Sequence, residues 1–179
     1  MRPLSAAVFA LAVAAATDPA AAQAPAPKVT TIKLNKLSAP PPAGWVSEKP
    51  KYTLRSYQFA VPGVKEAPAG EFIVMPESDP KAEKMFPRWK AQFQPGAEAK
   101  ESKLALKDAT AELLDVSGTW KYKERPFDPK SKEEEKVDYR VVWAVVVEKD
   151  EATHVRLSGP KAVVDKHYPA FEAWLKALK

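Results

Sequence analysis

The densest run of hydrophobic positions lies near the C-terminal end of the chain and predicts a β-hairpin. From Val137 to Glu148 the sequence is rich in valine, with few polar interruptions. Such a run is typical of a central strand that is buried on both faces. Residues 149–151 are all charged and supply a turn, and residues 153–157 alternate apolar and polar side chains on the returning strand.

Weaker alternation predicts further strands earlier in the chain. Residues 52–61 form the first, because most of their large apolar side chains fall on one face, and residues 71–75 form the second. Residues 110–117 form a third, and a further strand is expected to follow Gly118 through residues 120–122. These segments are separated by proline and glycine, as expected of strands joined by turns.

Two charged stretches are expected to lie outside the sheet. Residues 97–107 contain few large apolar groups and predict a surface connection. The stretch from Lys123 to Lys136 combines two prolines with charges of both signs and predicts an exposed loop.

Apolar residues spaced three and four apart predict two amphipathic helices. The first is expected to begin at Asp79 and Pro80, because the carboxylate can cap free amides and proline is tolerated in the first helical turn. The second follows Gly159 and Pro160. The two apolar stripes are Ala82, Met85, Phe86, Trp89 and Phe93, and then Val164, Tyr168, Phe171, Leu175 and Leu178 with Trp174 beside them.

Pro87 and Pro169 fall inside these stripes. Proline lacks an amide donor and clashes with the preceding helical turn, so each is expected to bend or break its helix. Antiparallel strands with segregated helices predict an α+β fold, in which a mainly antiparallel sheet is covered by helices.

The N-terminal segment has the layout of a secretory signal peptide. Arg2 precedes an apolar run of thirteen residues, 4–16, which is shorter than the roughly 20 residues that span a bilayer. We therefore expect a signal peptide at 1–22, an Ala/Pro-rich spacer with a possible short strand at 23–44, and one α+β domain at 45–179. The expected location is periplasmic or extracellular, with no permanent membrane span after cleavage.

The composition narrows the chemistry. The 179 residues include no cysteine, which excludes a disulfide framework, a thiolate metal site, a cysteine nucleophile and a bacterial lipid anchor. Phosphate-binding glycine motifs are also absent from the sequence. No cofactor or metal site is expected, because the acidic cluster 133–135 is interleaved with lysines, as in a solvated loop.

Catalytic candidates are few. His154 and His167 are the two histidines, and we expect both to be surface or helix-end imidazoles because no nucleophile elbow accompanies them. A carboxylate-dependent hydrolase that uses Asp115, Glu133 or Asp138 is the alternative, and it requires the fold to bring two acids together.

Three short motifs resemble those of small exported bacterial proteins of uncharacterised function from planctomycete-like genomes. The motifs are Arg88-Trp89-Lys90-Ala91-Gln92-Phe93, Pro42-Ala43-Gly44-Trp45 and Leu157-Ser158-Gly159-Pro160. At the level of the fold, the resemblance implies a PsbP-like α/β/α sandwich. Proteins with that fold are mostly binding or assembly factors, so the resemblance favours a binding role over catalysis.

The net charge of +5 and the isoelectric point of about 9.2 permit docking to acidic partners. Because the lysines are interleaved with acids and export is expected, nucleic acid is not an expected partner. Trp89, Trp143 and Trp174 are expected in the core. Trp45 and Trp120 lie beside glycine at segment ends, and exposure together with Tyr122 would create a binding surface.

The sequence therefore predicts a monomeric, non-catalytic binding or accessory module of the cell envelope. The expected partner is an envelope protein or an acidic polymer. The candidate partner-binding surface consists of Trp120, Tyr122, Lys123, Arg125, Lys130 and Lys132.

Overall fold

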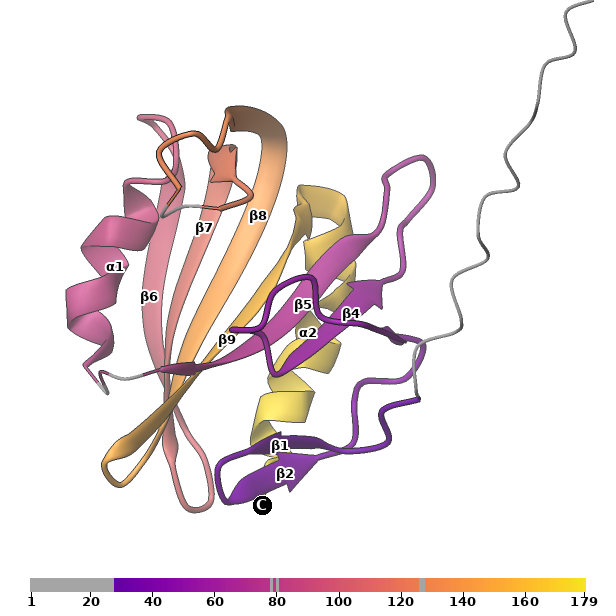
Figure 1. Cartoon of the computed structure of the whole chain (residues 1–179), viewed down its shortest axis with the longest axis vertical. Helices are drawn as coiled ribbons and strands as arrows, with labels where there is room; N and C mark the ends of the chain where they lie inside the picture. The colour runs from indigo at the N-terminus through magenta and orange to yellow at the C-terminus, as the bar shows by residue number, and fades with distance from the viewer. Residues whose placement is uncertain (1–27, 78, 80, 126–127) are drawn as a thin grey trace, which may run out of the picture.

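The structure is a computed structural model that describes residues 28–77, 79, 81–125 and 128–179. Its strands are β1 (Ile32–Leu34), β2 (Leu37–Ala39), β3 (Val46–Glu48), β4 (Tyr57–Val61), β5 (Gly70–Glu77), β6 (Glu98–Ala105), β7 (Thr110–Lys123), β8 (Glu133–Glu148) and β9 (Glu151–Pro160), and its helices are α1 (Ala82–Lys90) and α2 (Lys161–Lys176). Seven strands form one antiparallel sheet in the order β3-β4-β5-β9-β8-β7-β6, and β1 and β2 form a separate hairpin (Figure 1).

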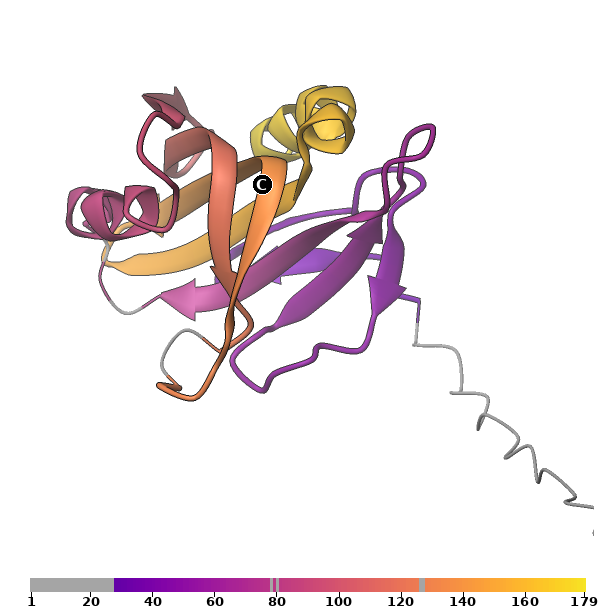
Figure 2. The ribbon, with the colours of Figure 1, turned by 90° about the horizontal axis from the view of Figure 1, so that it is seen from above.

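The two helices lie on opposite faces of the sheet (Figure 2). The core under α2 is built around Phe72, which contacts Trp45, Phe59, Phe171 and Trp174 with ring centroids 5.0–6.2 Å apart. The core under α1 is built from α1 and from the facing side chains of β7, β8 and β9. The α+β class with a mainly antiparallel, helix-covered sheet is therefore confirmed.

The predicted C-terminal hairpin is also confirmed. β8 and β9 pair from Tyr139 opposite Pro160 to Glu148 opposite Glu151. The side chains of residues 141–146 are all buried, and they alternate between the two cores. Burial on both faces explains why this stretch shows no polar alternation.

Three strand predictions need correction. β4 begins at Tyr57 rather than at position 52, because residues 51–54 form a turn that directs Arg55 into the protein. The predicted surface connection 97–107 is the strand β6. Within the part of the chain that the structure describes it is an edge strand paired with β7 alone, and its residues 98–103 are exposed while Leu104 is partly buried, so it shows no apolar alternation.

The third correction concerns β7, which is one strand of 14 residues rather than two. A bulge between Gly118 and Trp120 shifts its register against β8. β7 continues to Lys123 and β8 begins at Glu133, so the predicted loop from Lys123 to Lys136 is shorter than expected at both ends.

Both apolar stripes pack against the sheet, with Met85 and Tyr168 only partly buried, but Phe93 lies beyond the end of α1 and Leu178 beyond the end of α2. A break at either proline is not observed, because α1 and α2 each continue through the proline. Pro87 and Pro169 both face solvent, so water can satisfy the carbonyl group that loses its amide partner. The predicted helix start at Asp79 is wrong, because α1 begins at Ala82 after Lys81, and Asp79 Oδ1 accepts a hydrogen bond of 3.0 Å from the Lys81 amide before the helix; Pro80 lies outside the described residues.

The β1-β2 hairpin lies within the segment predicted as a spacer with a short strand. Ile32, Leu34, Leu37 and Ala39 pack into the core under α2. Ser38 and Lys179 exchange two backbone hydrogen bonds of 3.0 and 3.3 Å, which fix the hairpin to the C-terminal end of the chain. The predicted signal peptide lies outside the described residues. Among the residues that are described, no helix has the length and apolar character needed to cross a membrane.

Candidate binding groove

A groove of about 340 Å³ lies on the α1 side of the sheet, over the strands that α1 leaves uncovered. We call it the open-face groove. It crosses the sheet from the segment after β3 to the first residues of β8, and Figure 2 shows this side of the sheet facing away from α2. Its lining residues are Glu48, Lys51, Ala60, Ala69, Gly70, Glu71, Trp120, Tyr122, Lys136, Tyr139 and Ser158.

The floor of the groove contains a buried ion network centred on Glu71. Its Oε1 accepts a hydrogen bond of 2.7 Å from Arg55, and its Oε2 accepts one of 2.8 Å from Arg156. Burial acts to raise the pKa of Glu71, but the charges and hydrogen bonds of Arg156 and Arg55 outweigh it and lower the pKa. Glu71 is therefore ionised, with both carboxylate oxygens engaged, and two guanidinium groups share one carboxylate.

Gln58 connects this network to the segment that follows β3. Its Oε1 accepts hydrogen bonds from Arg55 Nη1 at 2.7 Å and from the Lys51 amide at 3.1 Å. Its Nε2 donates to Glu48 Oε2 at 2.8 Å. Gln58 is 2% exposed, so these bonds fix the position of the rim above it.

Aromatic rings form one wall of the groove. Trp120 is 4% exposed, and its indole donates to Gln92 Oε1 at 3.2 Å. The rings of Tyr122 and Tyr139 lie with centroids 4.9 and 6.0 Å from the Trp120 ring, and the Arg156 guanidinium carbon lies 5.3 Å from it. Trp120 therefore supports the wall from behind and is not an exposed contact residue.

The two tyrosine hydroxyls remain available to a ligand. Neither Tyr122 nor Tyr139 hydrogen-bonds through its hydroxyl to any part of the chain that the structure describes. Burial raises the pKa of both phenols, so both hydroxyls stay protonated at neutral pH and can donate. Ser158 donates only a long bond of 3.5 Å to the Glu71 carbonyl.

Exposed aliphatic side chains occur in segments that adjoin the groove in sequence or in the sheet. Within the described residues, the large hydrophobic side chains that are exposed are Val46, Leu54 and Val137, at 61%, 67% and 73%. Val46 lies directly opposite the groove residue Ala60, so the two side chains project from the same face of the sheet. Leu54 precedes Arg55 of the floor. Aliphatic groups beside a polar groove are typical of an interaction surface.

Two segments meet at the mouth of the groove. The segment after β3 contributes Tyr52, whose pKa is raised by burial and by the nearby Glu124 carboxylate at the end of the β7-β8 hairpin. The Arg55 guanidinium carbon lies 5.1 Å from the Tyr52 ring. The mouth is therefore built from elements far apart in sequence, so local pattern could not reveal it.

The residues proposed from sequence fall into two groups. Trp120 and Tyr122 belong to the groove, although Trp120, like Trp45, is buried rather than exposed. Lys123, Arg125, Lys130 and Lys132 are exposed at the end of the β7-β8 hairpin. There Lys123 pairs with Glu133 at 3.7 Å and Arg125 with Asp128 at 3.5 Å, which leaves Lys130 and Lys132 as the more available charges.

The candidate hydrolytic acids do not converge. Asp115 is held by two hydrogen bonds, of 2.9 and 2.6 Å, from Arg140. Glu133 lies opposite Lys123 in the sheet, well along β7 from Asp115. Asp138 adopts a φ of 52° next to the bulge. In the described part of the chain, no group of three histidine or acidic residues could hold a metal ion.

The histidines are packed rather than free. His154 is 6% exposed and stacks on Trp89 with centroids 4.7 Å apart, so the expectation of a surface imidazole was wrong for this residue. Burial, with a contribution from Arg156, lowers the pKa of His154 to about 3. In α2, His167 Nδ1 accepts from the Trp45 indole at 3.3 Å, while Nε2 lies 3.0 Å from the Pro62 carbonyl. Both rings are therefore structural.

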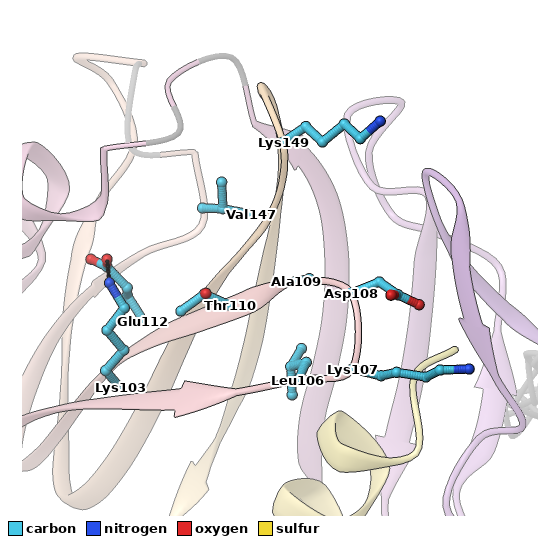
Figure 3. Close-up of a pocket in the computed structure, with 9 residues that line it drawn as sticks. All are labelled: Lys103, Leu106, Lys107, Asp108, Ala109, Thr110, Glu112, Val147 and Lys149. Atoms are coloured by element: carbon cyan, nitrogen blue, oxygen red, sulfur yellow. Dashed lines mark hydrogen bonds and ion pairs between the residues drawn. The ribbon is translucent and has the colours of Figure 1, made fainter.

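A second cavity, of about 450 Å³, lies between the β6-β7 turn and the β8-β9 turn. Figure 3 shows Lys107, Asp108 and Lys149 extending away from its centre, while Lys103 pairs with Glu112. Because its charged groups do not converge, this cavity is a weaker candidate than the open-face groove.

Comparison with known proteins finds a similar fold but does not show a function. No family model and no curated protein matches the chain. A crystal structure from Pseudomonas aeruginosa, described as protein PA94 of unknown function and putative regulator, is similar, with a TM-score of 0.51 and 14% identity over 84% of this chain and 95% of that one. The solution structure of cyanobacterial PsbP from Synechocystis sp. PCC 6803 has a TM-score of 0.45 and 12% identity, over 80% of this chain and 84% of that one.

Proposed function

We propose that this chain is a non-catalytic binding module of the cell envelope and that its partner docks in the open-face groove. The proposal rests on side chains at this groove that are free to contact a ligand. Two tyrosine hydroxyls without hydrogen bonds line the groove, and the exposed Val46 lies directly opposite its residue Ala60. These groups would gain contacts from a ligand, whereas the second cavity offers none of comparable kind.

The groove suits binding better than reaction chemistry. Its central carboxylate is neutralised by two guanidinium groups, so it is a poor general base or nucleophile. The network instead holds the floor rigid, which lowers the cost of ordering the site when a partner binds. Export follows in this proposal from the predicted signal peptide at 1–22. The partner is an envelope protein or an acidic polymer, with Lys130 and Lys132 as additional contacts.

A pull-down from envelope extract with rim variants tests the proposal. Val46→Asp and Leu54→Asp change exposed side chains, so both variants should fold normally. We expect each to reduce partner recovery by roughly tenfold or more, because a carboxylate would replace an apolar contact. Ala170→Asp changes an exposed residue on the outer face of α2 and is the matched control.

Lys130→Glu and Lys132→Glu test the outlying cations in the same assay. A loss with these variants alone would move the binding surface to the end of the β7-β8 hairpin. Equal recovery by wild type, both rim variants and the control would contradict a role for the groove.

A further inference from the structure

The strand β6 is a free edge of the sheet. It pairs with β7 from Glu98 to Ala105, and no strand pairs with its outer side among the described residues. Its residues 98–103 are exposed, so neither helix covers it. The opposite edge strand, β3, has only three residues. An edge of eight residues offers a row of backbone donors and acceptors that another strand can use.

The sequence of β6 is complementary to itself when two copies run antiparallel about Ser102. In an antiparallel pair, residues directly opposite each other project from the same face. Pairing Ser102 with Ser102 sets Glu101 opposite Lys103 and, by symmetry, Lys103 opposite Glu101. Ala99 then lies opposite Ala105, and the aliphatic stem of Lys100 lies opposite Leu104. This register therefore contains two Glu101–Lys103 pairs of opposite charge, and no two like charges lie opposite each other.

Neighbouring registers lack this match. An axis at Lys100 sets two lysines against each other, and an axis at Glu101 does the same with two glutamates. Like charges directly opposite destabilise a strand pair. The charged side chains of β6 disfavour pairing with unrelated strands. In pairing between two copies, they favour the register centred on Ser102.

Existing contacts leave the two charges available. Glu101 accepts a hydrogen bond of 2.6 Å from Lys90, and Lys103 donates one of 3.0 Å to Glu112; the side chains of Lys90, Glu101 and Lys103 are exposed, and that of Glu112 is partly buried. Exposed ion pairs contribute little stability, so sharing them with a second copy costs little. Both side chains point to the α1 side, because they lie opposite Leu114 and Glu112 in β7.

We propose that two copies of this chain pair along β6, antiparallel and centred on Ser102, to form a symmetric dimer with one continuous sheet. This inference is independent of the open-face groove and departs from the monomer expected from sequence. The partner is a second copy, because the charge match requires the same strand in reverse.

Sedimentation analysis of two single variants tests the pairing. Glu101→Lys sets lysine against lysine in a dimer of identical copies, and Lys103→Glu sets glutamate against glutamate. Each should weaken the wild-type dimer by about tenfold or more, since two favourable pairs become repulsive. Mixing the two variants restores both opposite-charge pairs, so the mixture should form dimers that contain one copy of each.

Lys166→Glu, on the outer face of α2, is the charge-matched control and should leave the dimer intact. A wild-type chain that sediments as a monomer at every concentration would overturn the proposal. So would variants that remain monomeric when mixed, or a control that dissociates the dimer equally.

Discussion

At the scale of single residues, His154 makes the folded state sensitive to acid. Its pKa is about 3 in the folded protein, against a usual value of 6.5, mainly because it is buried. In the folded state the ring stays neutral, whereas the unfolded chain takes up a proton below pH 6.5. The stability that this difference provides is complete above pH 6.5 and is lost as the pH falls toward 3.

The variant His154→Phe tests the direction of this pH dependence of stability. Phenylalanine keeps a planar ring against Trp89 but cannot bind a proton. Between pH 7 and pH 5, the wild type should lose about 2 kcal/mol more unfolding free energy than the variant. Urea unfolding at both pH values measures the difference. Identical pH dependence in the two proteins would show that His154 is protonated in the folded state.

Residue identity alone could not reveal these environments. His154 sits in an alternating strand and suggested an exposed ring, but α1 packs over that face and buries it. Trp120 suggested exposure at a segment end, but the bulge continues β7 and Tyr122 and Tyr139 cover the indole. In both cases distant segments decided the burial.

At the scale of elements, the segments with a strong hydrophobic pattern formed the helices and the strand that were predicted. The two apolar stripes and the valine-rich strand were read correctly because burial imposes those periods. β6 escaped prediction because an exposed edge strand has no apolar face. The groove was not predicted either, because its residues come from several segments from β3 through β9 and form no local sequence pattern.

Pro169 gives an element-scale prediction. α2 runs continuously from Lys161 to Lys176, and Pro169 faces solvent. Pro169→Ala should restore an amide donor to the Asp165 carbonyl without disturbing the core. The variant should gain about 1–3 kcal/mol of unfolding free energy, measured by urea denaturation. A loss of stability would mean that the proline-induced geometry of α2 is needed for its packing.

At the scale of the whole molecule, the two faces of the sheet differ. The α2 face is covered by α2 and by the β1-β2 hairpin, whereas α1 covers only part of the other face. The uncovered part holds a rigid ion network and tyrosines with free hydroxyls, and the exposed Val46 lies opposite Ala60 there. A stable scaffold with one incompletely covered face is the arrangement expected of a binding module.

Site-specific photo-crosslinking in living cells tests whether a partner binds in the open-face groove. A photoreactive residue is placed at Tyr139 in the groove, at Val46 opposite the groove residue Ala60, or at Lys166 on the outer face of α2. We expect a discrete adduct with one partner from the two positions at the groove and none from position 166. Adducts from position 166 alone, or from no position, would contradict a partner-binding role for the open-face groove.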